Sequence, residues 1–107
     1  MSIRLNVMNR AQGKTYEIIK RIENDTYHEM IVLVTSNSAK ELYPSHVSHK
    51  VFVVNNINSL DFLRGLKFKK VLIDEGFSYS KDKMALLYYE LGLRGWDIEV
   101  YGTPDLN

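Results

Sequence analysis

Hydrophobic residues in this chain come in short runs that polar segments separate. The runs at 30–36 (MIVLVTS) and 70–74 (KVLID) are apolar at nearly every position, which is typical of a strand buried on both faces. At the N-terminus, Ile3, Leu5 and Val7 instead alternate with polar residues, which predicts a strand over 3–8. The complete set of predicted strands is 3–8, 30–36, 50–54, 70–74 and 97–102.

Helical periodicity fills the gaps between these strands. A helix is predicted over 14–24, where Ile18, Ile19 and Ile22 share one face. Another is predicted over 82–94, where Met84, Leu87 and Leu91 line one side, with Tyr88 as a further member of that side. Shorter helices are expected from a Ser38 cap through Leu42, and from Asn58 or Ser59 through Arg64 with Gly65 as the stop.

Strands that alternate with helices indicate α/β architecture with a parallel sheet, because parallel strands need long crossover connections. We therefore expect a three-layer α/β/α fold with a mostly parallel five-stranded sheet. The length of 107 residues fits one domain, residues 1–107.

Composition narrows the class of protein. The net charge of +1 gives no argument for nucleic acid from the whole-chain field. The absence of cysteine excludes disulfides and cysteine-based zinc sites. No apolar stretch approaches the roughly 20 residues that span a bilayer, and the N-terminus lacks a signal-peptide core. We expect a soluble cytoplasmic protein with no membrane partner.

Gly13, Lys14 and Thr15 stand between the first predicted strand and the first predicted helix. A phosphate-binding loop has this order: backbone N–H groups and the helix N-terminus face the phosphates, the lysine adds charge, and the hydroxyl reaches Mg²⁺. The full pattern is G-x-x-x-x-G-K-[ST], and Met8 replaces its first glycine. By itself, the tripeptide fits equally well a surface loop before a helix.

Asp74 and Glu75 follow three apolar residues, 71–73, at the end of a predicted strand. At this position an aspartate is suited to hold Mg²⁺, usually through water, and the next acid is suited to deprotonate an attacking water. An isolated Asp-Glu pair is more often a solvated strand end. The Gly-Lys-Thr segment earlier in the chain favours the metal interpretation here.

Thr103 directly follows the last predicted strand, within IEVYGTPD (98–105). A strand beside the phosphate strand can present such a hydroxyl to the terminal phosphate or to the attacking water. Taken alone, Gly-Thr-Pro is better explained as a turn.

Together these segments resemble a small P-loop NTPase of the RecA-like branch. MNRAQGKT (8–15) resembles Walker A, particularly the variant of viral terminase large subunits, which also lacks the first glycine and carries an arginine. VLVTSNSAKEL (32–42), KVLIDEG (70–76) and VYGTP (100–104) resemble the later motifs of helicases and terminases, KVLIDEG matching Walker B.

The resemblance implies a role for each matching residue. Lys14 would bind phosphate, Thr15 and Asp74 would hold Mg²⁺, Glu75 would be the catalytic base, and Thr103 would be a sensor. The implied nucleotide-binding segment comprises Arg10, Ala11, Gln12, Gly13, Lys14, Thr15 and Tyr16. The implied function is a Mg²⁺-dependent ATPase that handles nucleic acid as a minimal helicase-like or terminase-like core. The resemblance also implies a viral protein in the host cytoplasm.

Two other functions stay open. Met8 and the lack of a second RecA-like domain in these residues fit an inactive P-loop-fold interaction module that modulates a host or viral protein. GKTYEIIKRI (13–22) and DEGF (74–77) also resemble thymidine kinases, although the chain has no cysteine for their zinc-bearing lasso. Expected partners are a nucleoside triphosphate, nucleic acid, a larger ATPase or other protein, and a second copy of the chain.

Two further features each have a structural and a functional interpretation. The basic segment 63–70, with Phe68 among its charges, could contact nucleic acid, but a charged connection before a buried strand is the commoner explanation. Arg94 could act in trans as an arginine finger, but a solvated charge at a helix end is the commoner explanation.

Overall fold

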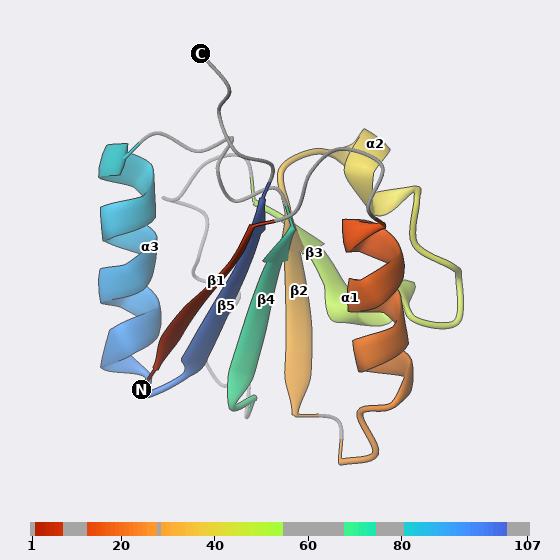
Figure 1. Ribbon diagram of the computed structural model, residues 1–107, viewed down its shortest axis with the longest axis horizontal. Helices are drawn as coiled ribbons and strands as arrows, with labels where there is room; N and C mark the ends of the chain where they lie inside the picture. Colours follow the sequence, from red (N-terminus) through yellow and green to blue (C-terminus); the bar gives the residue numbers. More distant parts are fainter. Residues whose placement is uncertain (1, 8–12, 28, 55–67, 75–80, 103–107) are drawn as a thin grey trace.

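A computed structural model describes residues 2–7, 13–27, 29–54, 68–74 and 81–102. Five strands form one sheet in which every pairing is parallel, in the order β1-β5-β4-β2-β3 (Figure 1). The elements in chain order are β1 (Ile3–Val7), α1 (Lys14–Glu23), β2 (Met30–Val34), α2 (Asn37–Lys40), the 3-10 helix η1 (Ser48–Lys50), β3 (Val51–Val53), β4 (Lys70–Asp74), α3 (Lys81–Leu93) and β5 (Asp97–Gly102). The predicted α/β class with a parallel five-stranded sheet is confirmed.

Helices cover both faces of the sheet, so the described elements form three layers (Figure 1). On one face, Ile18 and Ile22 of α1 pack in a core cluster that includes Leu72 of β4. On the other face, Leu87 and Leu91 of α3 pack in a separate cluster with residues of β2, β4 and β5. Each buried strand therefore contributes to two cores, which explains why its sequence is apolar at consecutive positions.

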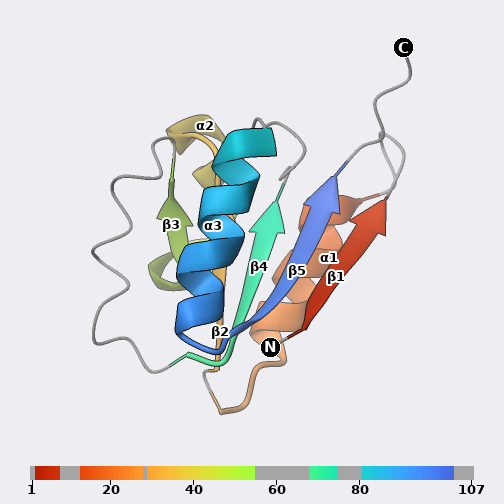
Figure 2. The ribbon, with the colours of Figure 1, turned by 90° about the vertical axis from the view of Figure 1, so that its left-hand side faces the viewer.

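The strand order and direction bring the candidate site residues to one end of the sheet. β5 lies between β1 and β4 (Figure 2). Because all strands are parallel, their carboxyl ends lie at the same end of the sheet. The start of α1 and the last residue of β4, Asp74, both lie at this carboxyl end.

Most element boundaries agree with the sequence patterns, with one correction. Ser36, not Ser38, caps α2: its Oγ accepts a hydrogen bond from the Ala39 N–H at 3.1 Å. Ser36 has the extended backbone that a cap requires, whereas Ser38 already lies within the first turn. Met8 and the helix predicted from 58 or 59 to 64 lie outside the described residues.

The alternating strand β1 is confirmed, but its apolar side is not covered. Ile3, Leu5 and Val7 are 44%, 57% and 58% exposed. The reason is the strand order, which puts β1 at the edge of the sheet.

In the described part of the chain, no helix is long and apolar enough to cross a bilayer.

Asp25 ties the connection between α1 and β2 to the chain before β3. Its carboxylate accepts hydrogen bonds from the N–H groups of Glu29 (3.0 Å) and Met30 (2.9 Å), and the Lys50 ammonium lies 3.3 Å away. Burial by itself would raise the pKa of Asp25, but these backbone hydrogen bonds and Lys50 lower it below its ordinary value.

Replacing Asp25 with alanine is expected to lower the free energy of unfolding by about 3 kcal/mol at neutral pH, because buried Lys50 loses its partner. The folded-state pKa is the lower one. The ionised carboxylate therefore stabilises the protein above the unfolded-state pKa of about 3.9, and this stabilisation is lost as the pH falls through the folded-state pKa. Urea unfolding at several pH values measures both effects.

Glu41→Ala is the control, since Glu41 is an exposed acid; its effect should stay within about 0.5 kcal/mol. A loss in Asp25→Ala that matched this control, or that persisted unchanged in acid, would contradict the assignment.

Candidate functional site

Gly13 makes the turn into α1. Its φ of +75° lies in the left-handed region that glycine adopts without strain. Among the described residues, an added Cβ would meet the Tyr16 Cβ at 3.8 Å, which is an ordinary van der Waals contact. No side-chain cap accompanies Gly13 at the start of α1. The first turn of a helix has N–H groups without intrahelical acceptors, and here the turn faces the carboxyl edge of the sheet.

Asp74 lies beside this turn and is only 5% exposed. The Thr15 hydroxyl donates a hydrogen bond to Asp74 Oδ2 at 3.0 Å. The Tyr43 hydroxyl donates to the same oxygen at 2.7 Å. The other oxygen, Oδ1, is buried and has no hydrogen-bond partner among the described residues. Thr15 and Asp74, which are 59 positions apart, are thus in direct contact.

Tyr43 is held in its protonated form. Burial, together with the negative charge and hydrogen bond of Asp74, raises the pKa of Tyr43 far above its ordinary value. The phenol therefore always donates, and it fixes the orientation of the carboxylate.

Two more polar side chains extend this site across the sheet. Asn6 of β1 is in register with Tyr101 of β5, and Tyr101 is in register with Asp74 of β4. Arg21 of α1 donates to the Tyr101 hydroxyl at 2.9 Å and pairs with Glu99. The Asn6 amide nitrogen is also buried without a partner among the described residues. The two unsatisfied buried groups therefore lie in one row of neighbouring strands.

The donor set fits a hard cation better than a soft one. A carboxylate and a hydroxyl offer only oxygen, which Mg²⁺ prefers, and the buried Oδ1 of Asp74 has unused acceptor capacity. The described residues contain no cluster of three or more His, Cys, Asp or Glu. Mg²⁺ usually takes one or two protein ligands and completes its shell with water and phosphate.

Other residues expected at the site fall into two groups. Lys14 is partly exposed at the start of α1, and Tyr16 is exposed with the Lys20 ammonium 5.6 Å from its ring centre. Arg10, Ala11, Gln12, Glu75 and Thr103 lie outside the described residues.

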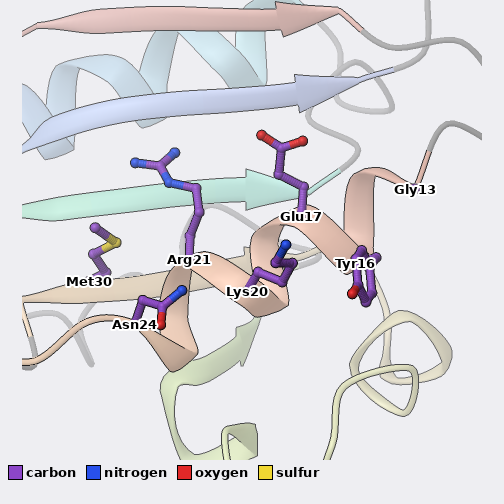
Figure 3. A pocket seen from close by; sticks show the side chains of 7 residues that line it. All are labelled: Gly13, Tyr16, Glu17, Lys20, Arg21, Asn24 and Met30. Carbon is purple, nitrogen blue, oxygen red and sulfur yellow. The ribbon is translucent and has the colours of Figure 1, made fainter.

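A groove of about 630 Å³ runs along α1 (Figure 3). Gly13 and Tyr16 line the end nearest the candidate site, while Asn24 and Met30 line the far end. Glu17 and Arg21 extend from α1 toward the neighbouring strands. The groove therefore borders the candidate site at Gly13, but Thr15 and Asp74 are not among the described residues that line it.

The basic segment and Arg94 have structural roles where they are described. Phe68 packs edge-to-face on Trp96, with ring centres 6.1 Å apart. Lys69 pairs with Glu29 at 3.1 Å, before β4 begins. Arg94 donates to the Glu90 carbonyl at 2.7 Å, at the edge of the sheet opposite Asp74. Residues 63–67 of the basic segment lie outside the described residues.

Sequence reasoning missed Tyr43, Asn6 and Tyr101. Tyr43 follows α2 without any motif spacing that links it to Asp74. Asn6 resembled an ordinary polar position of an alternating strand. Only the strand register and the α2 connection bring them to the site. The sequence matches no protein-family model and no curated protein.

Removing the Tyr43 hydroxyl is expected to destabilise the protein, because Asp74 would lose one of its two donors. Tyr43→Phe should lower the free energy of unfolding by about 1–2 kcal/mol, measured by urea titration. Tyr27→Phe makes the same chemical change at an exposed tyrosine and should have no measurable effect. Equal effects of the two substitutions would show that the hydrogen bond to Asp74 contributes nothing.

Proposed function

We propose that this protein binds a nucleoside triphosphate with Mg²⁺ through a P-loop formed by residues 8–15. The observation that carries the proposal is the 3.0 Å contact of Thr15 with Asp74, whose second oxygen is buried and has no hydrogen-bond partner among the described residues. A buried carboxylate oxygen without a partner is energetically unfavourable, and a cation or its water would satisfy it.

Each described residue would have a distinct part in binding. Gly13 allows the phosphates to approach the backbone, and the first turn of α1 directs N–H groups and its positive dipole end toward them. Lys14 would add a positive charge on the terminal phosphates. Thr15 and Asp74 would hold Mg²⁺, and Tyr43 would keep Asp74 oriented. Bound Mg²⁺ supplies neutralisation of the phosphate charge.

The proposed reaction is slow ATP hydrolysis, with Glu75 as the base that activates water, Lys14 as the charge stabiliser and Thr103 as the sensor. We further propose that hydrolysis serves nucleic-acid handling, as in helicase-like or terminase-like ATPase cores, in the cytoplasm of a virus-infected host. This part rests on the motif resemblance.

A second candidate, the interaction module without activity, is favoured by a separate observation. Leu86, Tyr89 and Leu93 of α3 are exposed large hydrophobic residues, and their spacing of three and four positions puts them on one helix face. The buried Leu87 and Leu91 occupy the opposite face. An exposed apolar stripe of this kind often marks a protein contact.

Mg²⁺-ATP is expected to raise the thermal unfolding midpoint, because a ligand of the folded state stabilises it by mass action. At about 100 times Kd the gain is about 2.7 kcal/mol, which corresponds to a shift of about 10 °C for a small domain. Lys14→Ala and Asp74→Asn should each abolish the shift, measured by scanning calorimetry with ATP, ADP and a non-hydrolysable analogue.

Lys69→Ala is the matched control, since it removes the same charge at the opposite edge of the sheet. It should keep the full shift. If wild type fails to respond to millimolar nucleotide, the binding proposal is wrong and the interaction module becomes the better explanation.

Glu75→Gln is expected to separate binding from hydrolysis. The amide cannot accept the proton of the attacking water, so phosphate release should fall by about 100-fold or more while the thermal shift with Mg²⁺-ATP persists. Phosphate release in wild type and variant measures the first quantity. Retained hydrolysis in Glu75→Gln would remove Glu75 from the base role.

A further inference from the structure

β1 is the outermost strand in the order of the sheet, so one of its two sides faces away from the other strands. β1 pairs with β5 on one side, and on the other side no strand among the described residues pairs with it. Natural sheets usually protect such edges with proline, lysine, a bulge or a covering segment. β1 has no proline or lysine, and Arg4 is its only charged residue.

The register shows which backbone groups face outward. The Ile98 N–H donates to the Ser2 carbonyl at 2.8 Å, and Ile3 is the register partner of Ile98. In a parallel ladder this alternation directs the N–H and C=O groups of Arg4 and Asn6 toward β5. The corresponding groups of Ile3, Leu5 and Val7 therefore point away from the sheet.

The same three residues carry the exposed apolar side chains. Ile3 and Leu5 are in register with Ile98 and Val100, which belong to the core cluster on the α3 side. The apolar side chains of β1 thus lie on the α3 side, while Arg4 and Asn6 lie on the α1 side. Figure 2 shows β1 as the outermost strand, beside β5.

We propose that β1 pairs antiparallel with β1 of a second copy of this chain, around a two-fold axis at Leu5. A closed homodimer built on one edge strand requires antiparallel pairing, because the two-fold axis reverses the strand direction. The result is one continuous sheet that runs through both copies, with α3 of each copy on the same face. The proposal is independent of nucleotide binding.

The sequence of β1 is self-complementary in this register. Leu5 faces the partner's Leu5, Ile3 faces the partner's Val7, and Arg4 faces the partner's Asn6. All outward N–H and C=O groups find partners, because the pairs of Ile3, Leu5 and Val7 are the hydrogen-bonded ones. Centring the axis on Arg4 would instead oppose two arginines and leave Val7 unpaired, which disfavours that register.

Amide exchange by NMR distinguishes this dimer from other associations. The N–H groups of Leu5 and Val7 should become protected as protein concentration rises from micromolar to millimolar. Those of Arg4 and Asn6, bonded to β5, should be protected throughout and serve as internal references. Sedimentation over the same range should show a monomer–dimer equilibrium.

A charge-swap set tests the register. Ile3→Lys and Val7→Glu should each raise the dimer dissociation constant by about tenfold or more, and the double variant should restore association because each lysine then faces a glutamate. Both positions are exposed in the monomer, so neither variant buries a charge within one copy. Within one strand the two positions are too far apart to pair.

Leu86→Lys is the matched control, since Leu86 is 51% exposed on the outer face of α3, away from β1. It should leave the dissociation constant unchanged. The proposal is overturned by a monomer at every concentration with unprotected Leu5 and Val7 amides. It is equally overturned by association that Leu86→Lys abolishes, or by a double variant that fails to restore what the single variants lose.

Discussion

The buried carboxylate of Asp74 is the point on which the arrangement of the carboxyl edge depends. One oxygen accepts hydrogen bonds from Thr15 in the first turn of α1 and from Tyr43 after α2, so three separate segments meet at one atom. A buried charge is tolerated only where such donors surround it. The other oxygen, Oδ1, has no partner among the described residues, and it is the atom to which the proposed function assigns a cation or its water. The stability of the fold and the proposed function therefore both depend on the Asp74 carboxylate. A buried oxygen without a partner lowers stability, and the same oxygen is available to the proposed ligand.

The parallel sheet brings these segments together. Because every strand is parallel, the strand ends with functional side chains all lie at the carboxyl end of the sheet, and each crossover connection returns the chain to the opposite end. β5 separates β1 from β4, and the first turn of α1 contacts the end of β4 through Thr15 and Asp74. Arg94 and Lys69 lie at the opposite end, which explains why they serve ion pairs and packing rather than the candidate site.

The molecule also has two apolar surfaces that its own described elements do not cover, at β1 and on the outer face of α3. They differ in what they can bind. β1 offers an ordered row of backbone groups with apolar side chains, so its partner must supply a strand. The α3 stripe offers side chains alone, which sets no such requirement. The two surfaces lie on different elements and are distinguishable by substitution.

The sequence alone predicts most of the elements: runs apolar at nearly every position became strands buried on both faces, and the three- and four-residue periodicity of 14–24 and 82–94 became α1 and α3. It also indicated Thr15 and Asp74, because residue type and position after a strand or before a helix are local properties. It could not determine that Tyr43 donates to Asp74, that Asn6 and Tyr101 share a row with it, or that Ile3, Leu5 and Val7 stay exposed. Those facts depend on strand order and register, which arise from contacts between residues far apart in the chain and have no local signal. They become visible only when the strands are assembled into the sheet.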